Sequence, residues 1–436
     1  MYFQVTPMIS QFRFLLRLGL FALGLTGLAR AELTVDITQG VEGAAPIAVV
    51  PFGQAGLAGE NLAHIVATDL AGSGRFTPLA EAQMPERPVP PEGVNFPVWQ
   101  SAGQEHVVIG RVVPGTGGAP HEAEFTLFDA IRGTSLLSER IPFKAADARH
   151  TAHRIADLIY QQLTGERGIF NTRIAYVTAS GSGKSREYRL QIADADGEAA
   201  REVMSSPEPI MSPAWSPDGK RMAYVSFEDR TAAVFVQNLS TGERRKVSGT
   251  PGINGAPAWS PDGSTLALTL SKDGNPEIYT LDVASGSLRR ITRDDAIDTE
   301  ASWSPDGRSL VMTSDRGGKP QLYLVPAAGG EPQRLTYEGE YNARGVFSPD
   351  GRRLAMVHGG EGGYRIAWMD LGSRNLKVVS RGRLDESPAF APNGHVIMYV
   401  RKDGGHEPLA MTSLDGQVQR TIPVRGGEVR GVAWSP

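Results

Sequence analysis

Three groups of residues in this chain have types and spacings that could bind a phosphate or a metal ion. The run from Thr178 to Ser185, Thr-Ala-Ser-Gly-Ser-Gly-Lys-Ser, ends like a phosphate-binding loop. It lacks the first glycine of such a loop, and the residues after it predict a strand rather than the helix whose N-terminus would hold a phosphate. We therefore do not expect nucleotide binding.

The other two groups suggest metal ions, but each lacks ligands. His150 and His153 lie three residues apart on a predicted helix without an evident third ligand, which favours solvated or packed histidines. Asp194 and Asp196 lack the spaced carboxylates and distal glutamate of a calcium loop, which favours a hairpin turn. The sequence also contains no Gly-x-Ser-x-Gly nucleophile elbow. We expect no enzymatic activity, no cofactor and no metal site.

A repeated position is more informative, because four of its six copies are Asn or Asp. Its residues are Ile210, Asn254, Asp298, Asn342, Asp385 and Val429. The position two residues later mixes small, acidic and basic side chains: Ser212, Ala256, Glu300, Arg344, Ser387 and Gly431. The first set predicts either a hydrogen-bond belt or a recognition rim, since loop backbones need partners in any case. The variation in the second set favours recognition.

These positions belong to a longer repeat that predicts the fold. The phrase Trp-Ser-Pro-Asp-Gly, or a variant of it, begins at Trp215, Trp259, Trp303, Phe347, Phe390 and Trp434. The aromatic residues are 44, 44, 44, 43 and 44 positions apart. Ser-Pro-Asp-Gly suits a type I turn, and four short strands per period are typical of a β-propeller blade. Because Phe replaces Trp in two copies, we expect the aromatic residue to be core rather than a ligand platform.

The two ends of the repeat predict how the ring closes. The first unit begins at its second strand, Arg173 to Val177, whereas the chain stops inside a first strand, Val432 to Pro436. The simplest solution is that residues 428–436 complete the first blade, which gives a six-bladed, all-β propeller over 172–436. Closure removes the exposed sheet edge that would favour aggregation.

The N-terminal residues predict export. Arg13 and Arg17 precede an apolar run of about 11 residues, and Ala29-Arg30-Ala31 fits a cleavage site, so residues 1–31 are expected to be a signal peptide. Met8 is an alternative start. Removing three arginines changes the formal charge from −4 to −7 (41 basic minus 48 acidic residues). A mildly acidic exported protein has no basic field for nucleic acid.

Residues 32–166 predict a small α/β domain of two helices on a mixed sheet. Strands are expected at Ile47–Phe52, His106–Val113, Ala123–Asp129 and Ser135–Ile141, and helices at Leu57–Leu70 and Ala145–Leu163. The Pro-rich stretch from Met84 to Pro97 is expected to be a loop. Residues 167–171 would then link this domain to the propeller.

The order of these parts resembles the TolB family of the Tol–Pal cell-envelope system, over essentially the whole mature chain. The resemblance rests on the signal peptide, the run Pro46-Ile-Ala-Val-Val-Pro-Phe52, the α/β domain, the six repeats and several internal phrases. These phrases are Arg173–Val177, Met211–Gly219, Asn254–Pro257, Thr299-Glu300, Pro332–Thr336, Leu384–Pro388 and Ala391–Gly394. The repeat alone also occurs in peptidase propellers, whereas the full order of parts is specific to this family.

The resemblance implies a Gram-negative periplasmic protein that binds the lipoprotein Pal at the propeller mouth and supports outer-membrane integrity and constriction at division. Colicins and other envelope proteins are further partners that it implies, with no membrane insertion and a monomer in the complex. The implied Pal-binding residues are Met211, Asn254, Gly255, Ala256, Thr299, Glu300, Asn342, Asp385 and Glu386. Many relatives carry a histidine at the position of Ile253, so the contact there is expected to be apolar.

The resemblance also implies that the mature N-terminal segment, residues 32–43, binds the inner-membrane-anchored protein TolA. Its residues are Glu32, Leu33, Thr34, Val35, Asp36, Ile37, Thr38, Gln39, Gly40, Val41, Glu42 and Gly43. Their alternation of apolar and polar types predicts a strand that pairs either with its own domain or with a partner.

Two other classes of protein are alternatives. Dipeptidyl-peptidase propellers share the repeat, but a hydrolase domain of a few hundred residues follows them, and here the chain ends inside the closing strand. A peptidoglycan- or carbohydrate-binding propeller would need exposed aromatic platforms at the rim, and Tyr337 and Tyr341 are the aromatic residues near it.

Overall fold

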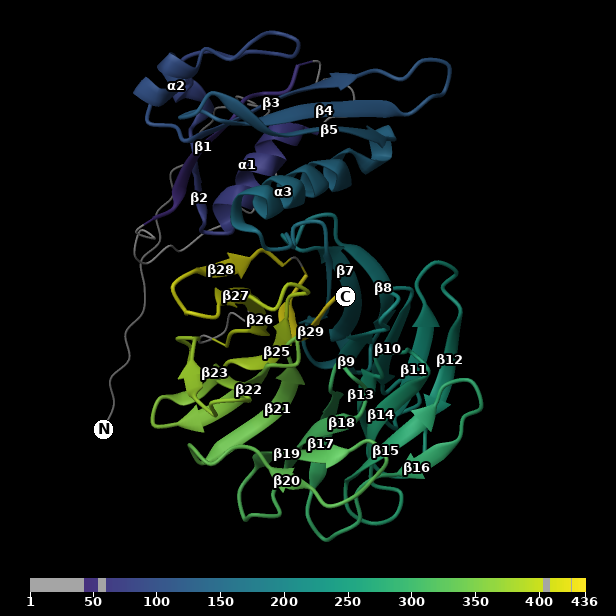
Figure 1. Cartoon of the computed structure of the whole chain (residues 1–436). Helices are drawn as coiled ribbons and strands as arrows, with labels where there is room; N and C mark the ends of the chain where they lie inside the picture. The colour runs from purple at the N-terminus through teal and green to yellow at the C-terminus, as the bar shows by residue number, and fades with distance from the viewer. Residues whose placement is uncertain (1–42, 54–59, 403–407, 425) are drawn as a thin grey trace, which may run out of the picture. The chain divides into compact units, whose positions relative to one another are not determined.

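The computed structural model describes residues 43–53, 60–402, 408–424 and 426–436 (Figure 1). The expected signal peptide and the expected TolA segment up to residue 42 lie outside these residues. All described residues belong to one compact unit, Leu33–Pro436. Within the described part of the chain, no helix is long and apolar enough to cross a membrane.

The N-terminal domain is a mixed sheet of order β2-β1-β3-β4-β5, in which β1 pairs in parallel with β2 and β3. The strands are β1 Ala45–Val49, β2 Phe76–Pro78, β3 His106–Val113, β4 His121–Asp129 and β5 Thr134–Phe143. Helices α1 (Leu62–Gly72) and α3 (Ala148–Thr164) pack with Ile47 and Val49 of β1, whereas Ala48 packs with Trp99 of a short helix, α2 (Phe96–Ser101). The predicted mixed sheet and its two long helices are confirmed.

Helix α2 is an addition to the predicted elements. It begins inside the stretch that was expected to be a loop, and it is too short to show a helical apolar period. Its Trp99 is fully buried, and its indole Nε1 donates a hydrogen bond to Glu86 Oε1 at 2.8 Å. A single large aromatic residue therefore holds this segment on the sheet.

Six four-stranded antiparallel sheets form the propeller (Figure 1). From the strand that lines the central channel outward, their orders are β29-β6-β7-β8, β9-β10-β11-β12, β13-β14-β15-β16, β17-β18-β19-β20, β21-β22-β23-β24 and β25-β26-β27-β28. The strands of the first three blades are β29 Glu428–Trp434, β6 Arg173–Ser180, β7 Glu187–Asp194, β8 Arg201–Ser206, β9 Ile210–Trp215, β10 Arg221–Ser226, β11 Ala233–Asn238, β12 Arg244–Ser248, β13 Asn254–Trp259, β14 Thr265–Leu270, β15 Glu277–Asp282 and β16 Leu288–Arg290. Those of the other three are β17 Asp298–Trp303, β18 Ser309–Ser314, β19 Gln321–Pro326, β20 Gln333–Arg334, β21 Tyr341–Phe347, β22 Arg353–Gly360, β23 Gly363–Asp370, β24 Leu376–Val378, β25 Glu386–Phe390, β26 Val396–Val400, β27 Leu409–Ser413 and β28 Gln419–Ile422.

The C-terminal strand closes the ring, as the repeat predicts. Strand β29 pairs antiparallel with β6, with Trp434 opposite Ile174 and Val429 opposite Thr178. The indole Nε1 of Trp434 donates to Thr172 Oγ1 at 2.8 Å. The first blade is therefore built from both ends of the propeller sequence.

The repeated tryptophans join neighbouring blades. The indole Nε1 of Trp259 donates to the carbonyl of Ala214 in the preceding blade at 3.2 Å, and that of Trp303 donates to the carbonyl of Ala258 at 3.1 Å. Trp259 is also buried. This packing role agrees with the prediction that the aromatic residue is core.

The Ser-Pro-Asp-Gly phrase closes the turn between the first two strands of a blade. In the second blade, Ser216 Oγ donates to Asp218 Oδ1 at 2.5 Å and accepts from the backbone N–H of Arg221 at 2.9 Å. The hydrogen bond from Ser216 lowers the pKa of the Asp218 carboxyl. Gly219 has a φ of 65°, which favours glycine at this corner. In this blade the turn therefore fixes where the inner strand ends and where the second strand begins.

Candidate functional site at the propeller mouth

Each inner strand carries a register shift of the kind made by a β-bulge, close to one mouth of the channel. The residues at these shifts have positive φ: Ser212 50°, Ala256 47°, Glu300 55°, Arg344 54°, Ser387 57° and Gly431 153°. They are the second repeated set in the sequence, and five of them are not glycine. Such a backbone costs about 1–3 kcal/mol per residue and is concentrated at functional sites, and bulges re-aim side chains. The side chains of the second set therefore point to the mouth from a strained backbone.

Two of these residues form an ion pair that joins adjacent blades. Arg344 Nε donates to Glu300 Oε1 at 2.6 Å, and Arg344 Nη1 donates to Ser387 Oγ at 2.6 Å. Burial alone would lower the pKa of Arg344, but the charges of Glu300 and Glu386 outweigh it and raise that pKa. The guanidinium thus stays charged and fixed at the mouth.

The backbone of the same two residues is anchored to the neighbouring blade. The N–H of Glu300 donates to Thr269 Oγ1 at 3.1 Å, and the N–H of Arg344 donates to Thr313 Oγ1 at 3.0 Å. These threonines lie on the second strand of the preceding blade. The bulges are therefore held in place by hydrogen bonds between blades.

All six residues of the first repeated set are buried beneath the rim, and its four Asn and Asp side chains form a hydrogen-bond belt there. Asn254 Oδ1 accepts from Ser248 Oγ at 2.7 Å and from the N–H of Thr250 at 3.0 Å. Asn342 Nδ2 donates to Gln321 Oε1 at 2.8 Å, and Asp385 Oδ2 accepts from the N–H of Gly382 at 3.0 Å. Asn254, Asn342 and Asp385 thus hold the loops that carry the rim, and their contacts with a partner stay a prediction.

Exposed apolar side chains surround the mouth, and the sequence patterns above do not predict them as a set. They precede the belt residues by one position and follow the same period: Ile253, Ile297 and Leu384 are 48%, 49% and 52% exposed. Tyr341 continues this set in a half-buried position. The constant period is the signal in the sequence that predicts this set. Together with Met211, which is 43% exposed, they make the rim strongly apolar.

The rim encloses a groove of about 920 Å³. Of the predicted partner residues, the groove is lined by Met211, Asn254, Gly255, Ala256, Thr299 and Glu300. Ile253, Ile297, Tyr341 and Arg344 line it as well. Glu386 lies at the mouth end of β25, where its Oε1 is 2.9 Å from Lys402 Nζ. The groove shares Met211, Glu300 and Arg344 with a channel of about 420 Å³ along the propeller axis.

The chemistry of this groove is recognition. It offers apolar side chains, backbone groups held by the bulges and one ordered ion pair. Among the described residues, the group of three His, Asp or Glu side chains close enough to hold a metal ion is Asp69, His153 and Asp196, which do not line the mouth. A six-bladed propeller with such a mouth, joined to a small α/β domain, is the architecture of a binding protein.

Comparison with known families agrees. Residues 160–436 match the model described as the TolB beta propeller domain, and residues 33–136 match the TolB amino-terminal domain. The chain belongs to the TolB family, a non-enzymatic component of the Tol–Pal system.

Individual relatives are similar over nearly their whole length. The Tol-Pal system protein TolB of Methylococcus capsulatus is 65% identical over 406 residues, which cover 93% of this chain and 95% of the relative. That of Thioalkalivibrio sulfidiphilus is 58% identical over 412 residues, covering 94% of each. The crystal structure of TolB from Acinetobacter baumannii superposes with a TM-score of 0.85 at 40% identity, covering 93% of this chain and 100% of that one.

Proposed function

We propose that this protein is a periplasmic adaptor of the Tol–Pal system that binds Pal at the propeller mouth and TolA through residues 32–43. Pal binding at the mouth is supported by one observation: exposed apolar residues, strained bulges and an ordered ion pair all lie around one groove. The proposed periplasmic location rests on the signal-peptide pattern of residues 1–31. In this proposal the adaptor supports outer-membrane integrity and constriction at division.

The physical basis of Pal binding would be a pre-organised surface. Exposed Ile253 and Ile297 gain free energy when a partner covers them, at roughly 25 cal/mol per Å² of apolar area. Arg344 and Glu300 already have fixed positions, so binding loses little side-chain entropy there. Aromatic, Arg and fully desolvated central residues are those that usually dominate such interfaces.

Calorimetric titration tests the site. Soluble Pal without its lipid anchor is titrated into the mature chain from Glu32, and into Glu300→Ala and Glu331→Ala variants. Glu331 is exposed and lies in the turn before β20, away from the groove lining, so it is the matched control. We expect one-to-one binding that Glu300→Ala weakens at least tenfold and Glu331→Ala leaves unchanged. Absence of binding by the folded protein would refute the proposal and bring the glycan-binding alternative forward.

A second pair of variants tests the apolar rim. Ile253→Ser removes an exposed apolar side chain at the mouth, and Ile131→Ser removes one, 62% exposed, on the α/β domain. We expect Ile253→Ser to weaken Pal binding about tenfold while the melting temperature stays unchanged, and Ile131→Ser to change neither. Equal affinities of the two variants would remove Ile253 from the site.

A further inference from the structure

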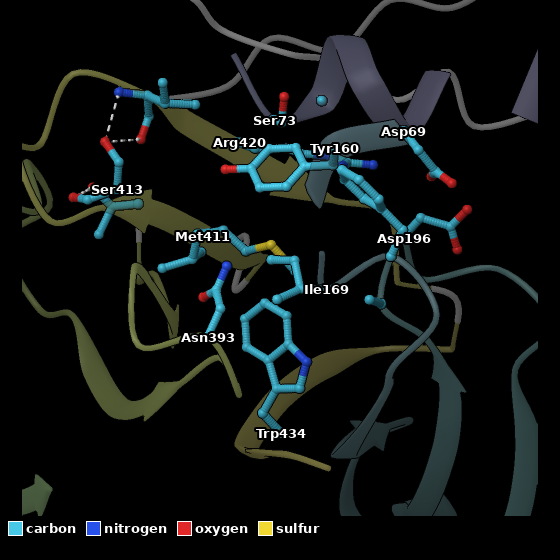
Figure 2. A pocket seen from close by; sticks show the side chains of 16 residues that line it. Asp69, Ser73, Tyr160, Ile169, Asp196, Asn393, Met411, Ser413, Arg420 and Trp434 are labelled. Atoms are coloured by element: carbon cyan, nitrogen blue, oxygen red, sulfur yellow. Dashed lines mark hydrogen bonds between the residues drawn. The ribbon is translucent and has the colours of Figure 1, made fainter. Parts of the chain in front are cut away.

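A second cluster of charged side chains, some buried and some half-buried, lies where α1 and α3 meet the propeller. It combines Asp69 of α1 and His153 of α3 with Asp194 and Asp196, which lie at the end of β7 and in the turn after it. Asp69 and Asp196 also line a small cavity of about 70 Å³ (Figure 2). The function proposed above does not use this cluster.

The imidazole of His153 bridges the two domains. Its Nδ1 lies 2.7 Å from Asp69 Oδ2 in the α/β domain, and its Nε2 lies 3.6 Å from Asp194 Oδ2 and 4.0 Å from Asp196 Oδ2 in the propeller. His153 is 1% exposed. A carboxylate therefore faces each nitrogen of a ring that water does not reach.

Arg149, one helical turn before His153, binds the same propeller carboxylates. Its Nε donates to Asp194 Oδ2 at 3.1 Å, and its Nη2 contacts Asp196 Oδ2. Two cations on α3 thus face two anions on the first blade. Opening this contact would leave charges on both sides without their partners, which is strongly unfavourable for groups that stay buried.

The third side of the cluster is Arg420 of β28. Its guanidinium is buried beside α1: a Cβ at Gly72 would lie 2.4 Å from Arg420 Nη1. Burial lowers the pKa of Arg420, and the nearby charges of Asp69 and Asp196 oppose this. Glycine at position 72 therefore lets a propeller side chain enter the domain boundary.

The protonation state of His153 follows from all the charged groups that face the cluster. They are Asp69 on α1, Arg149 and Asp157 on α3, Asp194 and Asp196 on the first blade, Arg420 on β28, and Glu60, which acts through Arg149. Burial lowers the pKa of His153, but its contact with Asp194, its hydrogen bond with Asp69 and the charges of Asp69 and Asp196 together raise it to about 10. His153 is therefore a cation at neutral pH, with a proton on each nitrogen.

A metal ion is a weaker interpretation of the same residues. Ligand atoms of Asp69, His153 and Asp196 lie within 4.8 Å of one another. Arg149 already neutralises the propeller carboxylates, and a metal would have to displace the Nε2 proton, since a ligating imidazole is neutral. The proton and the guanidinium together supply the positive charge that the carboxylates need.

The linker between the domains is anchored in both of them. Ile169 packs against the propeller core, whereas Phe170 belongs to the core of the α/β domain. Asn393 Nδ2 donates to the carbonyl of Arg167 at 3.2 Å. A change in domain orientation would turn about this short segment.

We propose that Asp69, His153, Arg149 and Asp194 form an electrostatic latch that holds the α/β domain on the first blade, and that loss of one of its charges lets the domain swing about residues 167–171. Strand β7 carries Asp194 at one end and Glu187 at the other, and Ala179, which pairs with Tyr188 of β7, also pairs with Glu428 at the mouth end of β29. One blade therefore connects the latch to the end of the ring that carries the mouth.

Spin labels measure the latch directly, because the chain has no cysteine of its own. Cysteines introduced as Ser138→Cys in β5 and Ala284→Cys after β15 are both at exposed positions, one in each domain. We expect a single narrow distance distribution in the otherwise unchanged chain and in His150→Gln, an exposed histidine on the same helix. Asp194→Asn and His153→Gln should broaden the distribution at least twofold. An unchanged narrow distribution in both variants would overturn the proposal.

A pH titration of the labelled, otherwise unchanged chain needs no destabilising variant. The pKa of His153 is higher in the latched state than its ordinary value of 6.5. The contribution of His153 to the stability of the latch is therefore complete below pH 6.5 and is lost as the pH rises towards about 10. We expect the distance distribution to broaden over this window and to be restored on return to pH 7. Nitrogen NMR should show an imidazolium for His153 at pH 8. A neutral ring at pH 8, or stoichiometric zinc binding at pH 7 that narrows the distribution, would overturn the protonated latch.

Discussion

Arg344 Nε lies 2.6 Å from Glu300 Oε1, although the two residues are 44 positions apart and belong to adjacent blades. Both have the positive φ of the bulge that lies near the start of each inner strand. The ion pair is therefore assembled by the ring itself before any partner arrives. This makes the two residues one unit of the mouth rather than two independent contacts.

A double-mutant cycle tests that unit. We expect Glu300→Ala and Arg344→Ala each to weaken Pal binding at least tenfold, because either change leaves the other charge without its partner. The double variant should bind Pal about as well as the single variant with the lower affinity, since the effects of substitutions within one network are not additive. Calorimetry measures all four affinities, and additive losses would show that the two side chains act separately.

The buried belt predicts a stability effect without direct partner contact. Asn254→Ala removes the acceptor of Ser248 Oγ and the donor to the carbonyl of Thr250, which lies 2.6 Å from Asn254 Nδ2. Leaving buried polar groups unpaired costs about 1–3 kcal/mol each, so we expect a lower urea midpoint. Asn375→Ala, at an exposed turn, is the matched control and should leave the midpoint unchanged. Equal midpoints would show that the belt is not needed for stability.

Ring closure predicts a strong dependence on the C-terminal strand. Deleting residues 428–436 removes the inner strand of the first blade and exposes the edge of β6. We expect the melting temperature to fall sharply, measured by calorimetry. Trp434→Phe keeps the aromatic packing but loses the hydrogen bond to Thr172, which should cost about 1 kcal/mol. A deletion variant that melts like the full chain would contradict six-blade closure.

The hydrogen bonds between Asp157 and the linker predict that the stability of the protein depends on pH. Its Oδ1 accepts from the N–H of Phe170 at 2.8 Å, and burial raises its pKa from 3.8 to about 6, although these backbone hydrogen bonds oppose the rise. The folded protein then binds a proton that the unfolded chain releases, so the free energy of unfolding should decrease as pH rises from about 4 to about 6. Asp157→Asn should flatten this slope in urea titrations. Exposed Asp147→Asn is the control, and an identical slope in both variants would contradict the assignment.

The proposed role of the N-terminal segment predicts that TolA binding can be removed without removing Pal binding. Deleting residues 32–43 should abolish TolA binding and change Pal affinity by a modest factor, because the mouth residues are left intact. Reciprocal coupling between two sites is typically about 1–3 kcal/mol. Calorimetry with each partner measures both effects. Retained TolA binding by the deletion variant would assign that partner to another surface.

Much of the propeller could be predicted from the sequence, because its determinants are local. The phrase from Trp215 to Gly219 specifies a turn through side chains that bond to the next few backbone groups, as Ser216 and Asp218 do. Copies of such a phrase at a constant period predict blades, and the incomplete units at the two ends predict their joining through β29. The short helix α2 was missed because six residues are too few to show a period.

The roles of the polar residues were decided by the tertiary structure. Asn254 belongs to the first repeated set and Glu300 to the second, which lies two residues later in each blade. The bulge and the curvature of the ring bury the first side chain and expose the second at the mouth. The latch is a stronger example, since Asp69, His153 and Asp194 are brought together from two domains. Sequence patterns report local backbone preferences, whereas burial and charge pairing depend on residues that meet only after the chain has folded.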